Sequence, residues 1–189
     1  MSLEKQLTET LELVTQMKSN NSLSQRTEET ILLLSKTIKE EKPILVCGNG
    51  GSASDAAHIT GELVGRFLKE RKAINAICLS SNLSAITAWA NDYSYETIFA
   101  RQVEAHGKNG GALLAISTSG NSKNIILAIE KAKELGIPII GLTGLGGGKM
   151  KELCDILIDV PSTSTPRIQE LHIMLYHYIC ERIEKDYQG

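Results

Sequence analysis

The segment GALLAISTSGNS, residues 111–122, decides the fold class of this protein. Its first half is a continuous apolar run, which is typical of a strand buried on both faces of a parallel sheet. Its second half contains four hydroxyl side chains, one glycine and one amide, with no charge and no aromatic ring. A helical pattern starts at Ser122. This order of strand, loop and helix predicts one unit of a right-handed β-α-β crossover.

The same order recurs along most of the chain. Further apolar runs of strand length lie at residues 43–48, 73–79, 137–144 and 154–160. Helical patterns lie between or after the runs, at residues 54–67, 83–90, 95–104, 122–135 and 166–185, with a short turn at 149–153. This alternation predicts an α/β fold, a five-stranded parallel sheet flanked by helices as in flavodoxin-like and Rossmann-like proteins.

Two more helices are expected before the first strand. Apolar residues repeat at helical spacing from Leu3 to Met17 and again from Ile31 to Ile38, and SNNS (19–22) separates the two patterns as a turn. We therefore expect one domain over residues 1–189. It comprises an N-terminal helical hairpin (1–40) and an α/β core with a long C-terminal helix (43–189).

Composition excludes several classes of protein. The net charge of −2, with both signs dispersed, argues against nucleic acid as a partner. No apolar run approaches the ~20 residues of a membrane-spanning helix, and the acidic amphipathic start does not resemble a signal peptide. The cysteines share no metal-like spacing, which favours reduced, buried thiols and a cytoplasmic location; they are Cys47, Cys78, Cys154 and Cys180.

The loop STSGNS (117–122) has two interpretations. In parallel sheets of this kind, ligands bind beyond the carboxyl ends of the strands. N–H groups at a helix N-terminus attract anions, and small hydroxyl side chains add donors, so the loop is suited to a phosphate group. Alternatively, Asn121 or Ser122 only caps the helix and Gly120 only permits the turn.

Two glycine loops also follow predicted strands. GNGGSASD (48–55) matches neither the dinucleotide pattern G-x-G-x-x-G nor a Walker loop. It is either a tight turn or part of one small-ligand pocket with STSGNS. TGLGGGKM (143–150) fits a flexible connection as well as it fits a ligand role.

Two helical segments carry candidate chemistry. His58 and Glu62 share one helix face and could bind a metal or move protons, or could form a simple surface pair. In RIQELHIMLYH (167–177), spacing alone favours Glu170 as the partner of His177, because residues seven apart point the same way. The polar residues of that helix, His172 among them, could also be merely solvated. Asn91 and Asp92 are ordinary turn residues or hydroxyl-binding groups.

Taken together, these segments resemble the signature segments of the phosphoheptose isomerases, bacterial enzymes built on a sugar-isomerase (SIS) domain. The resemblance follows the chain in order over nearly its whole length. It is carried by CGNGGSASDAAHITGELVGRF, WANDY, STSGNSKNIILAI, LTGLGGGKM and RIQELHIMLYH. It implies conversion of sedoheptulose 7-phosphate to D-glycero-D-manno-heptose 7-phosphate, the entry to activated heptose for lipopolysaccharide or capsule.

The resemblance also implies roles for individual residues. The phosphate would bind to Ser117, Thr118, Ser119 and Ser122, and the sugar to Asn49, Gly50, Gly51, Ser52, Arg66, Asn91, Asp92 and Gln169. One zinc ion per subunit would bind to His58, Glu62, Gln169 and His177. Gln169 thus replaces Glu170, the residue that spacing favours. Relatives form homotetramers with active sites between subunits, so the two halves of this ligand set could come from different chains.

The implied chemistry is a ketose–aldose proton transfer through an enediol or enediolate, with Glu62 as the base and His177 as the acid/base partner. Two alternatives are a regulatory tetramer of the DnaA-binding type and an isomerase of another phosphosugar. One departure is Pro166, where some relatives have an acidic residue. Here the proline is well placed to start the last helix.

Overall fold

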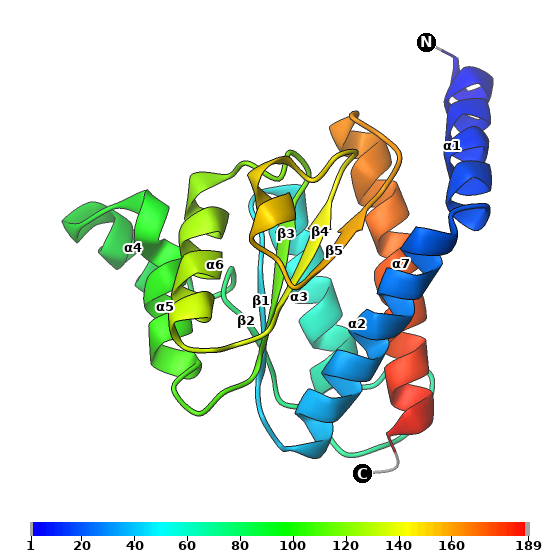
Figure 1. Ribbon diagram of the computed structural model, residues 1–189. Helices are drawn as coiled ribbons and strands as arrows, with labels where there is room; N and C mark the ends of the chain where they lie inside the picture. The colour runs from blue at the N-terminus through cyan, green and yellow to red at the C-terminus, as the bar shows by residue number, and fades with distance from the viewer. Residues whose placement is uncertain (1, 188–189) are drawn as a thin grey trace.

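A five-stranded parallel sheet forms the centre of the molecule in the computed structural model, which describes residues 2–187 (Figure 1). The strand order is β2-β1-β3-β4-β5, and every neighbouring pair is parallel. The predicted sheet is therefore confirmed, with the flavodoxin-like order. Its strands are β1 (Ile44–Cys47), β2 (Ala76–Cys78), β3 (Ala112–Ser117), β4 (Ile139–Thr143) and β5 (Ile156–Asp159).

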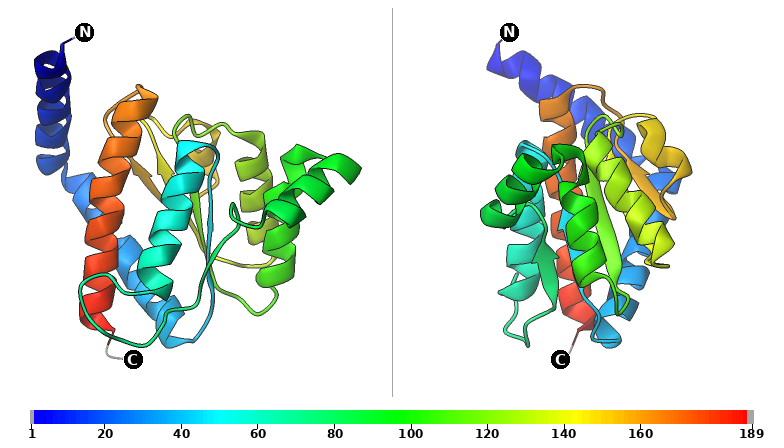
Figure 2. Two further views of the ribbon diagram at one scale, coloured as in Figure 1. Left: turned by 180° about the vertical axis from the view of Figure 1, so that it is seen from behind. Right: turned by 90° about the vertical axis from the view of Figure 1, so that its left-hand side faces the viewer.

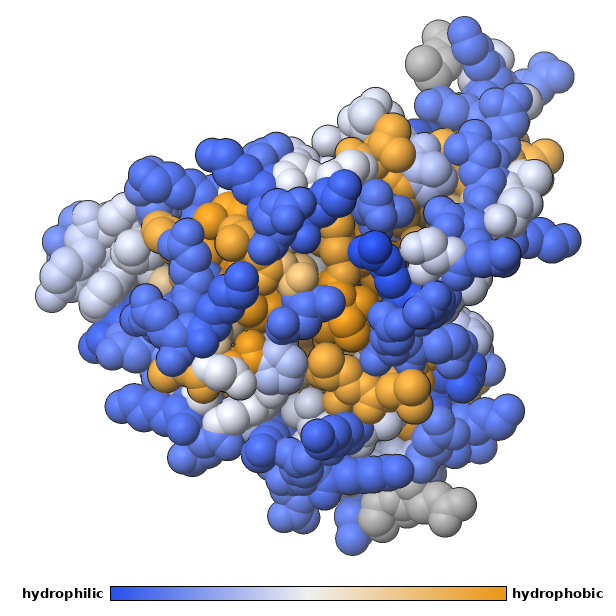
Figure 3. Space-filling model, viewed as in Figure 1, coloured by the Kyte–Doolittle hydropathy of each residue, from blue (hydrophilic) through white to orange (hydrophobic). Residues whose placement is uncertain are grey.

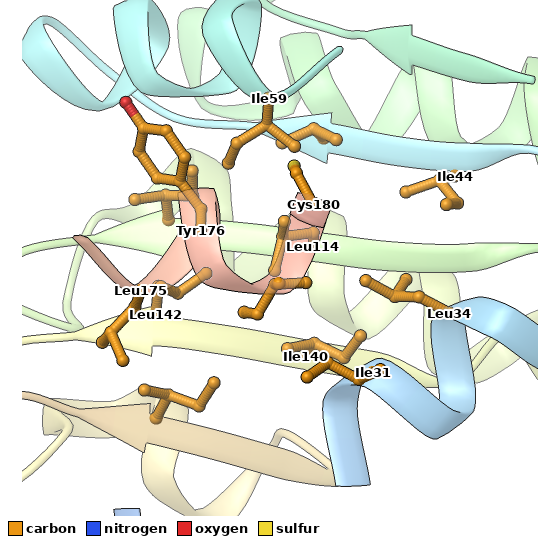
Figure 4. Packing of buried hydrophobic residues seen from close by; sticks show 14 of the residues in the cluster. Ile31, Leu34, Ile44, Ile59, Leu114, Ile140, Leu142, Leu175, Tyr176 and Cys180 are labelled. Carbon is orange, nitrogen blue, oxygen red and sulfur yellow. The ribbon is translucent and has the colours of Figure 1, made fainter. Parts of the chain in front are cut away.

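Helices cover both faces of the sheet (Figures 1 and 2). One face packs on α2 (Asn21–Lys39), α3 (Gly51–Val64) and α7 (Thr165–Asp186), and the other on α5 (Ile98–His106) and α6 (Lys123–Glu134). Alternate residues of β3 face the two layers, since Leu114 belongs to the first apolar cluster and Leu113 to the second. Figure 4 shows the first cluster, where side chains of the strands meet those of α2, α3 and α7. Burial on both faces explains why the strands are continuous apolar runs.

The predicted N-terminal helices form, but they do not fold back on each other as a hairpin. α1 (Leu3–Lys18) stands away from the body, and its first half contacts the start of α7, where Arg167 donates to the Thr10 hydroxyl (Figure 1). Leu13 is its only buried residue, while Leu3, Leu7 and Leu11 are exposed. A helix that buries so little apolar surface on α2 has no reason to lie along it.

Several helix boundaries differ from the prediction. α3 starts at Gly51 rather than residue 54 and ends at Val64 rather than residue 67. α4 (Leu83–Asp92) ends with Asn91 and Asp92, which we expected in a turn after the helix. The expected helix at 95–104 is a 3₁₀ turn, η1 (Tyr95–Thr97), followed by α5, and the expected turn near residue 150 is η2 (Gly148–Glu152). Pro166 lies in the first turn of α7, as predicted.

This topology determines where a ligand can bind. β1 and β3 are neighbours, although β2 lies between them in sequence, so the strand order reverses there and their two following loops meet at one edge. Polar side chains cover much of the face seen in Figure 3, and apolar ones gather near its middle. Within residues 2–187, no helix is long and apolar enough to cross a membrane.

Candidate functional site

The loop STSGNS joins β3 to α6 with its hydroxyl groups drawn together. The Ser122 hydroxyl lies 3.0 Å from that of Ser117, and the Ser119 hydroxyl lies 3.5 Å from Ser117. Ser122 occupies the N-cap position of α6, yet its side chain makes no capping hydrogen bond. The interpretation of this loop as a helix cap alone is therefore wrong. The hydroxyl cluster adjoins the start of α6, where the first N–H groups have no acceptor within the helix, and this combination suits an anion.

The loop TGLGGGKM (143–150) contacts STSGNS (117–122) and supports its conformation. Gly120 has φ +65°, and a Cβ there would collide with the carbonyl oxygen of Gly147. Lys149 N–H donates to the Asn121 side-chain oxygen (3.1 Å), and Met150 N–H donates to the Gly120 carbonyl (3.1 Å). Residues 143–150 are thus not a loose connection, because they hold the backbone of STSGNS in place.

The glycine loop GNGGSASD (48–55) meets the first turn of α6, directly after STSGNS, through a pair of amides. Asn49 and Asn124 donate to each other's side-chain oxygens at 2.8 and 2.9 Å, and the Tyr95 hydroxyl donates to Asn49 at 3.0 Å. Gly50, at φ 55°, is the N-cap of α3 and provides no side-chain cap, while the N–H groups of Ser52 and Ala53 donate to the carbonyls of Asn49 and Gly50. Neither Asn124 nor Tyr95 was predicted from the sequence. The available signal for Asn124 was an amide inside the apolar pattern of α6, where it is 3% exposed.

A compact donor cluster lies between α3 and α7. The Nε2 atom of His58 is 3.0 Å from the Glu62 carboxylate and 3.4 Å from Nε2 of His177. One ligand atom from each residue lies within 4.8 Å of the others. Two imidazoles and a carboxylate are a zinc-type donor set, and tetrahedral zinc requires at least one further ligand. The donors present therefore fit zinc, but they do not complete its shell.

Two buried groups stand behind His58. The Tyr176 hydroxyl lies 2.9 Å from Nδ1 of His58 and 3.4 Å from an oxygen of Asp55. Burial raises the pKa of Asp55, although the Tyr176 hydroxyl and His58 oppose the rise. Burial also raises the pKa of Tyr176 well above its ordinary value, with the Asp55 charge adding to the effect.

The segment after α3 is held by a buried carboxylate. Glu184 of α7 accepts hydrogen bonds from the backbone N–H groups of Phe67 (2.8 Å), Leu68 (2.6 Å) and Lys69 (2.8 Å). Arg71 lies 3.2 Å from the same carboxylate and donates to the carbonyl of Glu62 at 2.6 Å. Its guanidinium also reaches other carbonyls at the end of α3, which explains why the helix stops early.

Other candidates lie outside the donor cluster. Gln169 is eight residues before His177, about 12 Å along a helix, and its amide covers Gly51. Asn91 and Asp92 are exposed and hydrogen-bond to each other at 2.9 Å, with no hydrogen bond to either glycine loop among the described residues. Arg66 is exposed on the segment that Glu184 holds. Ser52 is buried under the first glycine loop.

The structure also shows the surroundings of Glu170 and His172, two polar residues of α7 that were candidates from the sequence. Glu170 is bound by Arg167 at 2.7 Å and by Thr10 of α1 at 3.3 Å, away from His177. His172 is fully buried with Nε2 3.2 Å from the Thr143 carbonyl, and burial lowers its pKa to about 4. His172 is therefore a neutral core residue, not a solvated one.

Comparison with known proteins gives a consistent result. The model of the SIS domain family matches residues 7–144. A phosphoheptose isomerase from Helicobacter pylori is 53% identical over 170 residues, covering 90% of this chain and 88% of the relative. One from Clostridium acetobutylicum is 46% identical over 187 residues, covering 99% and 95%. The structure of a phosphoheptose isomerase from Neisseria gonorrhoeae superposes with a TM-score of 0.90 at 36% identity, covering 97% of each chain.

These matches extend over nearly the whole chain, and they agree with the family that the sequence segments resemble. With its SIS domain and its full-length similarity to these relatives, the chain belongs to the phosphoheptose isomerase family.

Proposed function

We propose that this protein is an aldose–ketose isomerase that converts sedoheptulose 7-phosphate to D-glycero-D-manno-heptose 7-phosphate. The observation that carries the proposal is the pairing, within one fold, of an uncharged anion loop (117–122) with the donor cluster of His58, Glu62 and His177. A phosphosugar needs both, because one end is held as a dianion while protons move at the other. The sequence relatives support the choice of a heptose phosphate.

The phosphate would bind to the hydroxyls of STSGNS and the N–H groups that start α6, and the sugar would contact Asn49, which its partner Asn124 holds in place. Gly50, Gly51 and Ser52 would also contact the sugar, as would the side chains of Arg66, Asn91 and Asp92. The two glycines would let the substrate approach the backbone closely.

In the reaction, the Glu62 carboxylate accepts the proton from the substrate carbon, and His177 exchanges a proton with the neighbouring oxygen. His58, Glu62 and His177 would also hold one zinc ion, which supplies positive charge beside the enediolate oxygens.

A homotetramer with active sites between subunits is part of the proposal. The Gln169 amide lies against Gly51, and the residue is about 12 Å along α7 from His177. A second copy could supply its amide instead, and so complete the ligand set. The exposed leucines of α1 (Leu3, Leu7 and Leu11) offer an apolar contact for such an assembly. We further propose a cytoplasmic enzyme whose product enters activated heptose for lipopolysaccharide or capsule.

The direct test is an NMR assay of sedoheptulose 7-phosphate with the metal-replete protein. We expect the signals of the aldose phosphate to appear, to be lost after treatment with a chelator, and to return with zinc. Other ketose phosphates in the same assay test whether a different phosphosugar is preferred. No aldose product from metal-replete protein would contradict the proposal and favour a regulatory SIS-domain protein.

Replacing Ser119 or Ser122 by alanine is expected to weaken the binding of phosphorylated sugars. Each hydroxyl removed from a charged acceptor costs about 1.5–3 kcal/mol, which corresponds to a loss of about 10–100-fold in affinity. Calorimetric titration with substrate measures this loss. Ser24→Ala, an exposed serine of α2, is the matched control and should bind as wild type does. Unchanged affinity in both loop variants would place the phosphate elsewhere.

A further inference from the structure

Two buried residues that the proposed reaction does not use, Asp55 and Tyr176, stand directly behind the donor cluster. Tyr176 is 1% exposed and Asp55 6% exposed. Figure 4 shows the Tyr176 ring in the apolar cluster with its hydroxyl pointing out of that cluster toward α3. There the hydroxyl lies between His58 of α3 and Asp55, one turn earlier on the same helix. The ring therefore has a packing role, but the position of its oxygen needs a separate explanation.

Hydrogen counting allows the hydroxyl two arrangements. The phenol keeps its one proton at neutral pH. It can donate that proton to Nδ1 of His58, which places the imidazole proton on Nε2, or donate it to Asp55 and accept Nδ1–H from His58. Only the second arrangement leaves a lone pair on Nε2, the atom that faces Glu62 and His177.

Asp55 favours the second arrangement. Its carboxylate is buried, and one of its oxygens has no hydrogen-bond partner among the described residues. The other oxygen receives only the Tyr176 hydroxyl within the same part of the chain. A buried carboxylate without a donor is costly, so turning the hydroxyl away from Asp55 is unfavourable.

We infer that Asp55 and Tyr176 are positioning residues that act in series on His58: Asp55 accepts the Tyr176 proton, and Tyr176 accepts Nδ1–H of His58, which keeps Nε2 available to the metal. Metal-ligating histidines commonly donate their second N–H to such a partner, and loss of the partner lowers metal affinity. The inference rests on the proposed function for the assignment of His58 as a ligand.

The experiment measures Zn²⁺ affinity by competition with a chromogenic chelator, using full-length protein. Tyr176→Phe and Asp55→Ala are each expected to weaken Zn²⁺ binding by about 10–100-fold. Because Asp55 acts through Tyr176, the double variant should bind no more weakly than Tyr176→Phe alone. If each residue acted on the metal site independently of the other, the losses would instead be additive.

Controls separate this effect from general loss of structure. Tyr178→Phe removes the hydroxyl that donates to Glu28 on another side of α7, and it should leave Zn²⁺ affinity unchanged. Asp55→Asn keeps a side-chain oxygen that can accept from Tyr176, so it should restore part of the affinity lost in Asp55→Ala. Circular dichroism of each variant checks that the fold is retained.

The tautomer itself can be read by ¹⁵N NMR of the imidazoles, since the chain has only four histidines. In zinc-loaded wild type we expect His58 to carry its proton on Nδ1, hydrogen-bonded to Tyr176. Additive losses, unchanged affinity in both single variants, a zinc-loaded His58 protonated on Nε2, or no Zn²⁺ binding at all would each overturn the inference. Normal Zn²⁺ behaviour without turnover of sedoheptulose 7-phosphate would contradict the proposed function only.

Discussion

Glu62→Gln is expected to lower kcat for sedoheptulose 7-phosphate by about 10²–10⁴-fold, the usual contribution of a positioned general base. Glutamine keeps the size of the side chain and a carbonyl oxygen in place of a carboxylate oxygen, but it cannot take a proton from carbon. The phosphate loop is untouched by the change. Substrate should therefore still raise the melting temperature of the variant. Initial rates by NMR at saturating zinc, with thermal shift measurements beside them, provide both values.

The matched control for Glu62→Gln is Glu170→Gln. Spacing along the last helix had favoured Glu170 as the partner of His177, but Arg167 and Thr10 hold its carboxylate on the side facing α1. We expect Glu170→Gln to retain wild-type turnover. A Glu62→Gln variant with the wild-type rate would show that the base lies elsewhere, and loss of turnover in Glu170→Gln would revive the interpretation from spacing.

Glu184→Ala is expected to destabilise the protein by about 3–5 kcal/mol, as breaking a buried ion pair does. The variant leaves three backbone N–H groups of residues 67–69 without their acceptor and the buried Arg71 without its counter-charge. Equilibrium unfolding in urea, at one protein concentration for all variants, measures the change. Glu181→Ala, an exposed glutamate one turn earlier on α7, is the control and should stay within about 0.5 kcal/mol of wild type.

The pH dependence of stability gives a second measure of this interaction. Burial alone would raise the pKa of Glu184, but the three backbone donors and Arg71 together hold it below its ordinary value. Its stabilising effect is therefore fully present above the unfolded pKa of about 4.3. It declines as the pH falls through the lower folded value. The difference in stability between wild type and Glu184→Gln should shrink in that window. A difference that does not change with pH would mean that the carboxylate charge is not its source.

Glu184 connects stability with the site. The segment that it holds contains Arg66 and Phe67, and the Phe67 ring lies 5.5 Å from the His177 ring. Arg71 in turn holds the last turn of α3, which contains Glu62. Any folded fraction of Glu184→Ala should therefore show weaker turnover as well, because one end of the donor cluster loses its support.

Much of the architecture could be predicted from the sequence. Apolar runs of strand length, each followed by small polar residues and a helical pattern, predict a parallel sheet because strands buried on both faces need no alternation. The same loops predict an anion site at the strand ends. The start of α3 was missed by three residues, since glycines rarely signal the first turn of a helix. The open arrangement of α1 was missed because an amphipathic pattern does not say what its apolar face meets.

The sequence by itself determined the parallel sheet, the loop chemistry and, through resemblance, the residues with candidate roles, since these depend on local pattern and residue type. Only the tertiary structure decided which residues meet. It separated Glu170 from His177 and joined Asn49 to Asn124, 75 positions apart, and it brought Asp55 and Tyr176 behind His58. The contacts of Tyr176 with His58 and Asp55 arise where α3 and α7 pack side by side on the sheet. Helical spacing gives the direction of a side chain within its own helix, whereas its partner on another element depends on packing.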